Sequence, residues 1–171
     1  MVLASRSLPP GSYAECGVFR GDSAVLIADN LPDGADLWLF DSFEGHGEPC
    51  KFDDPEHPKG RYKDTKPGDV ISRLRTDINV TLVIGYIPHT FRRVPYKLDF
   101  RFVHIDVDHY GPTKAACEFF LPRMVPGGII RFDDYGAVSG ATKAIDEVIG
   151  RERLLPGDWR LEMPLTSTCK K

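Results

Sequence analysis

The sequence predicts an α/β domain with a mostly parallel, doubly wound sheet that helices cover on both faces. Two observations support this fold. Short, nearly continuous apolar segments alternate with segments whose apolar residues recur at helical spacing. Glycine or acidic residues follow each apolar segment, at the position where parallel α/β sheets bind their ligands. A chain of 171 residues fits one domain, so we expect residues 1–171 to form a single unit.

The expected strands are short apolar runs, many of them rich in β-branched or aromatic residues. They comprise residues 12–16, 37–40, 80–84, 100–105 and 129–132. Residues 159–169 are expected to add a strand pair at the end of the chain. A turn is expected at residues 126–128, which read Pro-Gly-Gly.

Helices are expected between these strands. Residues 22–30 begin at a capping Asp or Ser and end just before a proline, and residues 112–121 begin with a proline at the first helical position. Residues 67–75 and 140–149 complete the set. Residues 42–65 show no period, and such a long irregular stretch in a compact domain is either a functional lid or disordered.

The composition excludes several classes of protein. The formal net charge is −3 and no run of Lys or Arg could follow a phosphate backbone, so no nucleic-acid partner is expected. No apolar run approaches the ~20 residues that a membrane-spanning helix needs, and the N-terminus lacks the apolar core of a signal peptide. The spacing of Cys16, Cys50, Cys117 and Cys169 fits neither a zinc site nor a small disulfide scaffold. We therefore expect reduced thiols in a cytoplasmic protein.

A glycine turn follows the first expected strand. Glu15, Gly17 and Gly21 form a loose E-x-G-x-x-x-G pattern, in which glycines let a ligand approach the backbone and the next helix N-terminus favours an anion. An ordinary tight turn explains this pattern equally well. Asp41 ends the second strand roughly 20 residues later, where a carboxylate can accept hydrogen bonds from both hydroxyls of a ribose. A helix cap or a solvated loop acid is the alternative.

Acidic residues also follow the fourth and fifth expected strands. Asp106, Asp108 and His109 come after the fourth, and Asp133 and Asp134 come after the fifth. Four carboxylates at one edge of a sheet repel each other, and a hard divalent cation, Mg²⁺ most simply, neutralises them. Such an ion lowers the pKa of a substrate hydroxyl, and either Asp108 or His109 could then act as the general base. Any single aspartate here could instead be a helix cap.

The remaining histidines give no functional signal. His46, His57 and His89 have no partner that the sequence reveals, and we expect them at the surface or in loops.

Several blocks taken in order resemble the macrocin O-methyltransferase family. These blocks read ECGVFRGDSA, FDSFEG, KGRYKDT, HIDVDHYGPTKAA, FFLPRMVPGGIIRFDDYG and ATKAIDE, and they extend over residues 13–148. The family consists of S-adenosylmethionine-dependent enzymes with the class I, Rossmann-like methyltransferase fold. The resemblance implies a seven-stranded sheet, methyl transfer to a hydroxyl group, and Mg²⁺.

The resemblance also implies roles for single residues. The residues implied to bind S-adenosylmethionine are Glu15, Gly17 and Gly21 at the methionine part, Asp41 at the ribose, Ser42 and Phe43 beside the adenosine, and Asp106. The residues implied to hold the metal are Asp106, Asp133 and Asp134. The base would follow the first metal aspartate by two or three positions, which leaves Asp108 and His109 both open.

The expected function is O-methylation of a hydroxyl on a sugar or another small polyhydroxylated metabolite. Family members usually carry an N-terminal helical segment that closes the site or builds the oligomer. Only about a dozen residues precede the first expected strand, so we expect residues 44–63 to enclose the substrate, and a homodimer is compatible with the sequence. Two alternatives remain: a non-catalytic cofactor-binding domain, and a glycosyltransferase that uses Asp106 and Asp108 as a D-x-D metal motif.

Overall fold

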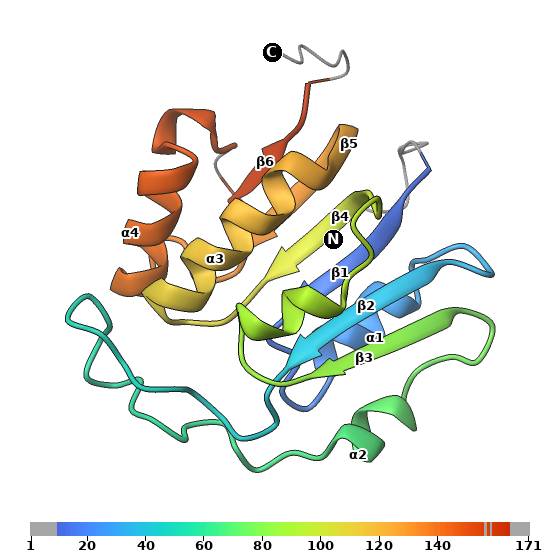
Figure 1. Cartoon of the computed structure of the whole chain (residues 1–171), viewed down its shortest axis with the longest axis horizontal. Coiled ribbons are helices and arrows are strands. Elements are labelled where there is room, and N and C mark those ends of the chain that lie inside the picture. The colour runs from blue at the N-terminus through green and yellow to red at the C-terminus, as the bar shows by residue number, and fades with distance from the viewer. Residues whose placement is uncertain (1–9, 156, 158, 165–171) are drawn as a thin grey trace.

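The computed structural model describes residues 10–155, 157 and 159–164. Its centre is one sheet in the strand order β3-β2-β1-β4-β5-β6, in which five strands run parallel and β6 runs antiparallel to β5 (Figure 1). The strands are β1 (Ser12–Cys16), β2 (Asp36–Asp41), β3 (Asn79–Ile84), β4 (Phe100–Ile105), β5 (Met124–Phe132) and β6 (Arg160–Glu162). The mostly parallel sheet is confirmed, whereas the expected number of seven strands is wrong, because the described residues form six.

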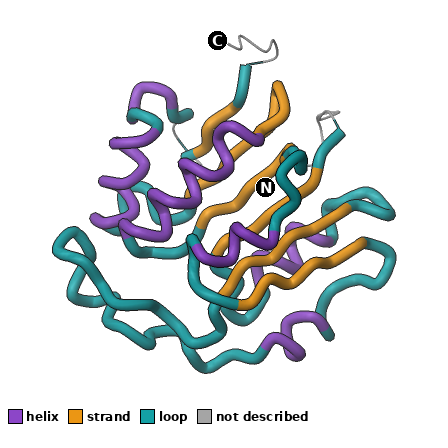
Figure 2. Tube along the Cα trace, in the orientation of Figure 1, coloured by secondary structure: helices purple, strands orange, loops and turns teal. Residues whose placement is uncertain are grey.

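Helices pack on both faces of the sheet, which confirms the doubly wound architecture (Figure 2). The α-helices are α1 (Asp22–Ala28), α2 (Pro67–Ile71), α3 (Tyr110–Phe120) and α4 (Ser139–Val148). The 3₁₀ helices are η1 (His89–Arg93), η2 (Leu121–Arg123) and η3 (Arg151–Arg153). Helices α1 and α2 share one core cluster with the sheet, and α3, α4 and η1 share the other.

The two cores follow from the alternation of side chains along each strand. In β2, Leu37 and Leu39 pack toward α1, while Phe40 packs toward α3 and η1. In β4, Phe102 joins the first core and Val103 joins the second. All five side chains are almost completely buried. A strand that is apolar on both sides is stable only between two helical layers, which is why the nearly continuous apolar runs predicted this fold.

The structure differs from the sequence-based expectation in three elements. The expected turn at residues 126–128 lies inside β5, where four residues of β5 (125–128) stand opposite one residue of β4, and the extra residues form a bulge that suits Pro and Gly. Helix α2 ends at Ile71, four residues earlier than expected. The expected strand pair at the end of the chain contributes one strand, β6, with an isolated bridge from Leu155 to Arg160, and residues 165–169 lie outside the described residues.

Residues 42–66, which we call the β2–α2 loop, contain no helix or strand. Figure 1 shows this loop running from the end of β2 past the ends of α3 and α4 and back to α2. Two acidic side chains attach it: Asp53 accepts a hydrogen bond from the backbone N–H of Tyr110 (2.6 Å), and Asp54 accepts one from Ser139 (2.8 Å). Each acid thus caps a helix N-terminus, so the loop has defined anchors and is not disordered.

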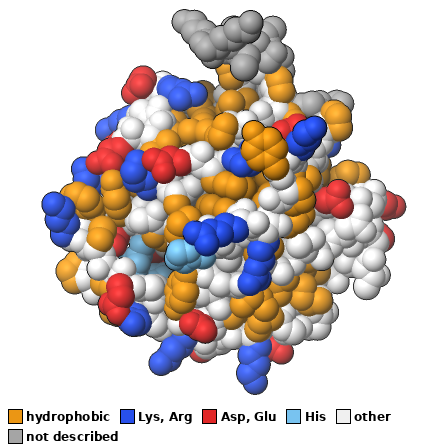
Figure 3. All heavy atoms as spheres, in the orientation of Figure 1, with side chains coloured by type: hydrophobic (Ala, Val, Ile, Leu, Met, Phe, Trp, Pro, Cys, Tyr) orange, Lys and Arg blue, Asp and Glu red, His pale blue; other side chains and the backbone are white. Residues whose placement is uncertain are grey.

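Two observations concern the helices and the surface charge. None of the helices in the described part of the chain has the length and apolar character to cross a bilayer. Figure 3 shows acidic and basic side chains interspersed over one face of the molecule, without a broad region of either sign.

Candidate active site

A cavity of about 1150 Å³ opens at the carboxyl ends of the parallel strands. One residue from the end of each parallel strand contributes to its wall: Gly17, Asp41, Gly85, Asp106 and Asp133. The cavity lies beside β1, which β2 flanks on one side and β4 on the other, so it occupies the topological switch point of the sheet. The structure thus brings the polar strand ends together as the sequence predicted.

The glycine turn after β1 requires glycine for a steric reason. Gly17 has a φ of +83°, and a Cβ atom there would lie 1.6 Å from the backbone oxygen of Asp106. Gly21 also has a positive φ, +85°, and begins α1 against Val70. The ordinary tight-turn interpretation is therefore correct for both glycines, because each adopts a backbone conformation that other residues rarely adopt. Gly17 also lines the cavity, and Gly21 does not.

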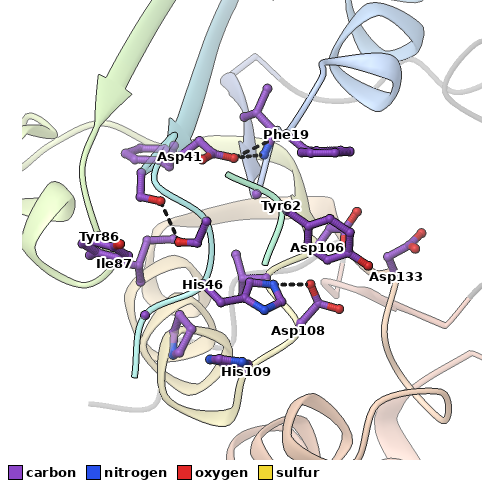
Figure 4. A pocket seen from close by; sticks show the side chains of 18 of the residues that line it. Phe19, Asp41, His46, Tyr62, Tyr86, Ile87, Asp106, Asp108, His109 and Asp133 are labelled. Carbon is purple, nitrogen blue, oxygen red and sulfur yellow. Dashed lines mark hydrogen bonds and ion pairs between the residues drawn. The ribbon is translucent and has the colours of Figure 1, made fainter. Parts of the chain in front are cut away.

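Asp41 holds this turn against the end of β2. Its Oδ2 accepts hydrogen bonds from the backbone N–H groups of Val18 (2.6 Å) and Phe19 (2.9 Å), and its Oδ1 accepts one from Phe43 (2.7 Å) (Figure 4). A carboxylate oxygen has about two acceptor sites, so Oδ2 is filled by its two donors and Oδ1 keeps one site for a hydroxyl donor from the cavity. Ser42 also lines the cavity, whereas Phe43 packs against the core beside α1.

Three aspartates form a cluster of the kind that holds a cation. One carboxylate oxygen each from Asp106, Asp133 and Asp134 lies within 4.8 Å of the others. Burial, followed by the nearby charge of Asp134, raises the pKa of Asp106 to about 8. Burial also raises the pKa of Asp134 to about 6, with Asp108 as the next cause. Partly buried carboxylates that resist ionisation fit a hard divalent cation, because the ion would supply the missing positive charge.

A buried histidine connects this cluster to β1. His104 Nδ1 lies 2.9 Å from Glu15 Oε1, and His104 Nε2 lies 3.6 Å from Asp133 Oδ1. Burial alone would lower the pKa of His104, but the carboxylates of Asp133 and Glu15 outweigh it and raise the pKa to about 9. In turn His104 lowers the pKa of Asp133. Glu15 is completely buried and does not line the cavity, so the structure places it beneath the site.

The two candidate bases, Asp108 and His109, both lie on the cavity wall, but they contact different groups. Asp108 has its carboxylate between two imidazoles, with His46 Nε2 at 2.8 Å and His57 Nδ1 at 3.1 Å. His109 is 3% exposed, and its Nε2 lies 2.8 Å from the backbone oxygen of His57. We expected His46 and His57 to be surface or loop residues without a partner, and the second part is wrong, because both contact Asp108. They belong to a loop, but they are mostly buried against Asp108.

Fold and site together define an α/β domain with a polar cavity at the carboxyl edge of a parallel sheet. Residues 14–135 match the family described as "Methyltransferase domain", and the chain belongs to this family.

Two curated relatives are similar at modest identity. The mycinamicin III 3''-O-methyltransferase of Micromonospora griseorubida is 27% identical over 84% of this chain and 62% of its own length. The 8-demethyl-8-(2,3-dimethoxy-alpha-L-rhamnosyl)-tetracenomycin-C 4'-O-methyltransferase of Streptomyces olivaceus is 27% identical over 83% of this chain and 59% of its own length. The chain thus spans about three fifths of the length of these relatives.

Solved structures show the same fold. The O-methyltransferase NovP superimposes with a TM-score of 0.74 at 20% identity, covering 91% of this chain and 72% of that protein. The calicheamicin methyltransferase CalS11 gives a TM-score of 0.68 at 23% identity, with 90% and 72% covered. An O-methyltransferase from Bacillus cereus in complex with SAH gives 0.52 at 17% identity, with 80% and 59% covered. These similarities confirm the Rossmann-like methyltransferase fold.

Proposed function

We propose that this chain is the cofactor-binding and catalytic domain of an S-adenosylmethionine-dependent O-methyltransferase. The observation that carries the proposal is the single cavity that joins a glycine turn fixed by Asp41 to the carboxylates of Asp106, Asp133 and Asp134. Methyl transfer to oxygen needs a nucleoside site, an alignment surface and a way to remove a proton. This cavity offers residues for all three, and its volume of about 1150 Å³ leaves room for a cofactor and an acceptor together.

The acceptor we propose is a hydroxyl group on a sugar or another small polyhydroxylated metabolite. The names of both curated relatives describe O-methyltransferases, and one of them names a rhamnosyl group. A second structure of CalS11 is described as a TDP-rhamnose 3'-O-methyltransferase. The ordered sequence blocks described above favour the macrocin type within the broader family.

We propose that Asp106, Asp133 and Asp134 hold Mg²⁺. The fit rests on the donor set, because three carboxylates provide only oxygen ligands and two of them have raised pKa values. Bound Mg²⁺ would supply the positive charge that lowers the pKa of the acceptor hydroxyl. His104 supports the cluster from below, because it holds Asp133 ionised.

Asp108 is the better candidate for the general base. Its Oδ2 shares one hydrogen bond with His46 and its Oδ1 lies 3.1 Å from His57 Nδ1, so a lone pair remains for the hydroxyl proton. His109 has its Nε2 occupied by the backbone oxygen of His57, which leaves that nitrogen unable to take a proton. In the proposed reaction the acceptor hydroxyl gives its proton to Asp108, and its oxygen takes the methyl group of S-adenosylmethionine. The products are a methyl ether, S-adenosylhomocysteine and a protonated Asp108.

The structure weighs against the D-x-D alternative. In that motif Asp106 and Asp108 would share one metal, yet Asp106 groups with Asp133 and Asp134, while Asp108 groups with histidines. Asp41 could still hold the ribose of a uridine nucleotide, but the glycine turn and the Asp133–Asp134 pair would then have no role. A non-catalytic cofactor-binding domain would bind the cofactor in the same way but would not transfer a methyl group, so a turnover measurement distinguishes it from the proposed enzyme.

Calorimetric titration with S-adenosylhomocysteine is the first test. We expect binding by the wild-type chain, binding weakened at least about tenfold by Asp41→Asn, and no change for Glu56→Gln, whose exposed side chain lies off the cavity. UDP with Mn²⁺ is the control ligand, and stabilisation by it without any binding of S-adenosylhomocysteine would favour the glycosyltransferase.

Turnover separates an enzyme from a binding domain. Formation of S-adenosylhomocysteine is measured with TDP-rhamnose and with a panel of glycosides as acceptors, in Mg²⁺ and in a chelator. We expect methyl transfer that needs Mg²⁺ and that Asp106→Asn abolishes while cofactor binding persists. Cofactor binding without transfer to any acceptor would leave only the binding-domain alternative.

A further inference from the structure

Two histidines of the β2–α2 loop lie on the carboxylate of Asp108, one on each oxygen. His46 Nε2 lies 2.8 Å from Oδ2, and His57 Nδ1 lies 3.1 Å from Oδ1. The three side chains are only 10–14% exposed. Figure 4 shows His46 pointing at Asp108 across the cavity wall, with the contact drawn as a dashed line. The loop and the end of β4 therefore meet at this one carboxylate.

The backbone of Asp108 is fixed independently of the loop. Asp108 has a φ of +59°, in the left-handed region that few residues other than glycine adopt. Its backbone N–H donates to Asp134 Oδ2 at 2.9 Å. The turn between β4 and α3 thus sets where the residue stands, whereas the direction of its carboxylate depends on the two imidazoles.

The histidine rings are held by further contacts that keep their nitrogens in place. The rings of His46 and His57 stack at 5.6 Å between centroids with an angle of 15°. His46 also packs against Tyr62 at 5.2 Å and His109 at 4.4 Å. Ring packing of this kind limits rotation, so His46 Nε2 stays within hydrogen-bonding distance of Asp108 and the His57 ring stays beside it.

The two imidazoles contact Asp108 in different ways. His46 Nε2 forms a hydrogen bond with Asp108 Oδ2. His57 Nδ1 lies 3.1 Å from Asp108 Oδ1, but it is a buried nitrogen that forms no hydrogen bond with the described residues. His46 therefore fixes the direction of the carboxylate, and His57 closes the space beside its other oxygen.

We propose that His46 and His57 are positioning residues that clamp Asp108 and thereby make the proposed base depend on the placement of the β2–α2 loop. The inference rests on the proposed function for the role of Asp108, but the clamp itself is a property of three side chains. The same three residues could also surround a metal that prefers imidazole, because their ligand atoms lie within 4.8 Å of one another. His46 already forms a hydrogen bond with Asp108 without an ion, so we favour the clamp, and the buried Nδ1 atoms of both histidines, which have no hydrogen-bond partner among the described residues, make Zn²⁺ binding the alternative to test.

Matched variants separate the donor from the ring. His46→Gln places an amide N–H where Nε2 stood, and His57→Asn places one where Nδ1 stood. His46→Leu and His57→Leu replace each ring by an apolar side chain that has no nitrogen. Glu56→Gln is the control, because Glu56 is exposed and adjacent to His57 in the loop.

Hydrogen exchange of the loop amides is the first readout and needs no acceptor. His46 and Gly60 give protected reporters, because the His46 N–H donates to the Arg61 oxygen (2.9 Å) and the Gly60 N–H donates to the His46 oxygen (2.8 Å). We expect His46→Leu to speed this exchange about 10- to 100-fold, the effect of losing one hydrogen bond to a charged group, His57→Leu to speed it by a smaller factor above about threefold, and the amide variants to stay within about threefold. Glu56→Gln should leave exchange unchanged.

A double-mutant cycle tests whether the histidines act through Asp108. Asp108→Ala should speed loop exchange as the Leu variants do, and adding His46→Leu to it should have little further effect. For methyl transfer to TDP-rhamnose we expect His46→Leu to lower kcat about 10- to 100-fold with KM little changed, and His46→Gln to restore most of it. Binding of S-adenosylhomocysteine should be unchanged in all of these variants.

Three results would overturn the clamp. Gln and Leu variants that behave alike would show that ring packing, not the donor, matters, and additive effects in the cycle would show that Asp108 is not the target. Zn²⁺ that the wild type binds and that both His46→Leu and His57→Leu fail to bind would establish metal ligation instead. Absence of turnover with every acceptor is a different result, because it refutes the proposed function while the exchange cycle still decides the clamp.

Discussion

Replacing Asp106 by Asn should make the metal-free protein more stable at neutral pH, although it should abolish activity. The carboxyl group has a pKa of about 8 in the folded chain against an ordinary value of 3.8, mainly because of burial and the charge of Asp134. The folded state therefore binds a proton more tightly than the unfolded state does. Stability contributed by this group is present at low pH and is lost as the pH rises from 3.8 toward 8.

The size of the effect follows from this window. At pH 7 the loss is (7 − 3.8) × 1.36, or about 4 kcal/mol, as an upper figure. Asp134 can itself take up a proton and share the repulsion, so we expect about 2–4 kcal/mol. Asn keeps the shape and removes the charge, which should raise Tm at pH 7 by about 5–15 °C for a chain of this length. At pH 5 the gain should shrink to about 1–2 kcal/mol.

Thermal unfolding in a chelator, at pH 5, 6, 7 and 8, measures this difference between wild type and variant. Added Mg²⁺ should then stabilise the wild type at pH 8 and leave Asp106→Asn unchanged, because the variant has lost a ligand. A variant that is less stable than the wild type at pH 8 in the chelator would refute the account of Asp106 as a strained carboxylate within an acidic cluster.

Other predictions concern the turn, the ribose acid and the thiols. Gly17→Ala should cost more than about 3 kcal/mol of stability or prevent folding, as urea unfolding would show, because a Cβ there meets a backbone oxygen at 1.6 Å. Asp41→Ala should lower the urea midpoint as well as cofactor affinity, since three backbone N–H groups lose their acceptor, whereas an effect on affinity alone would contradict this. Iodoacetamide should modify exposed Cys50 well before Cys16 or Cys117, because burial raises the pKa of both buried thiols, that of Cys117 to about 12. Peptide mapping of the native protein measures the order of modification, and a different order would contradict this.

The sequence by itself determined the layers of the fold and one edge of the site. Residues 37–40 of β2 are apolar on both faces, and only a parallel sheet between two helical layers buries such a strand fully. Parallel strands that start at one edge must end at the other, so Gly17, Asp41, Asp106 and Asp133 were bound to meet once the strands were recognised. These are local signals, and their consequence needs no knowledge of the loops.

Only the tertiary structure decided the partners of Asp108 and the shape of β5. His46 lies 62 positions before Asp108, in a loop without a period, so nothing local in the sequence ties the two together. Their contact depends on where Asp53 and Asp54 attach the loop to the N-termini of α3 and α4. The bulge in β5 likewise arises from pairing with β4, and its Pro-Gly-Gly segment alone indicates only a turn. Contacts between an aperiodic loop and a distant strand end are set by docking geometry, which a hydrophobic pattern does not encode.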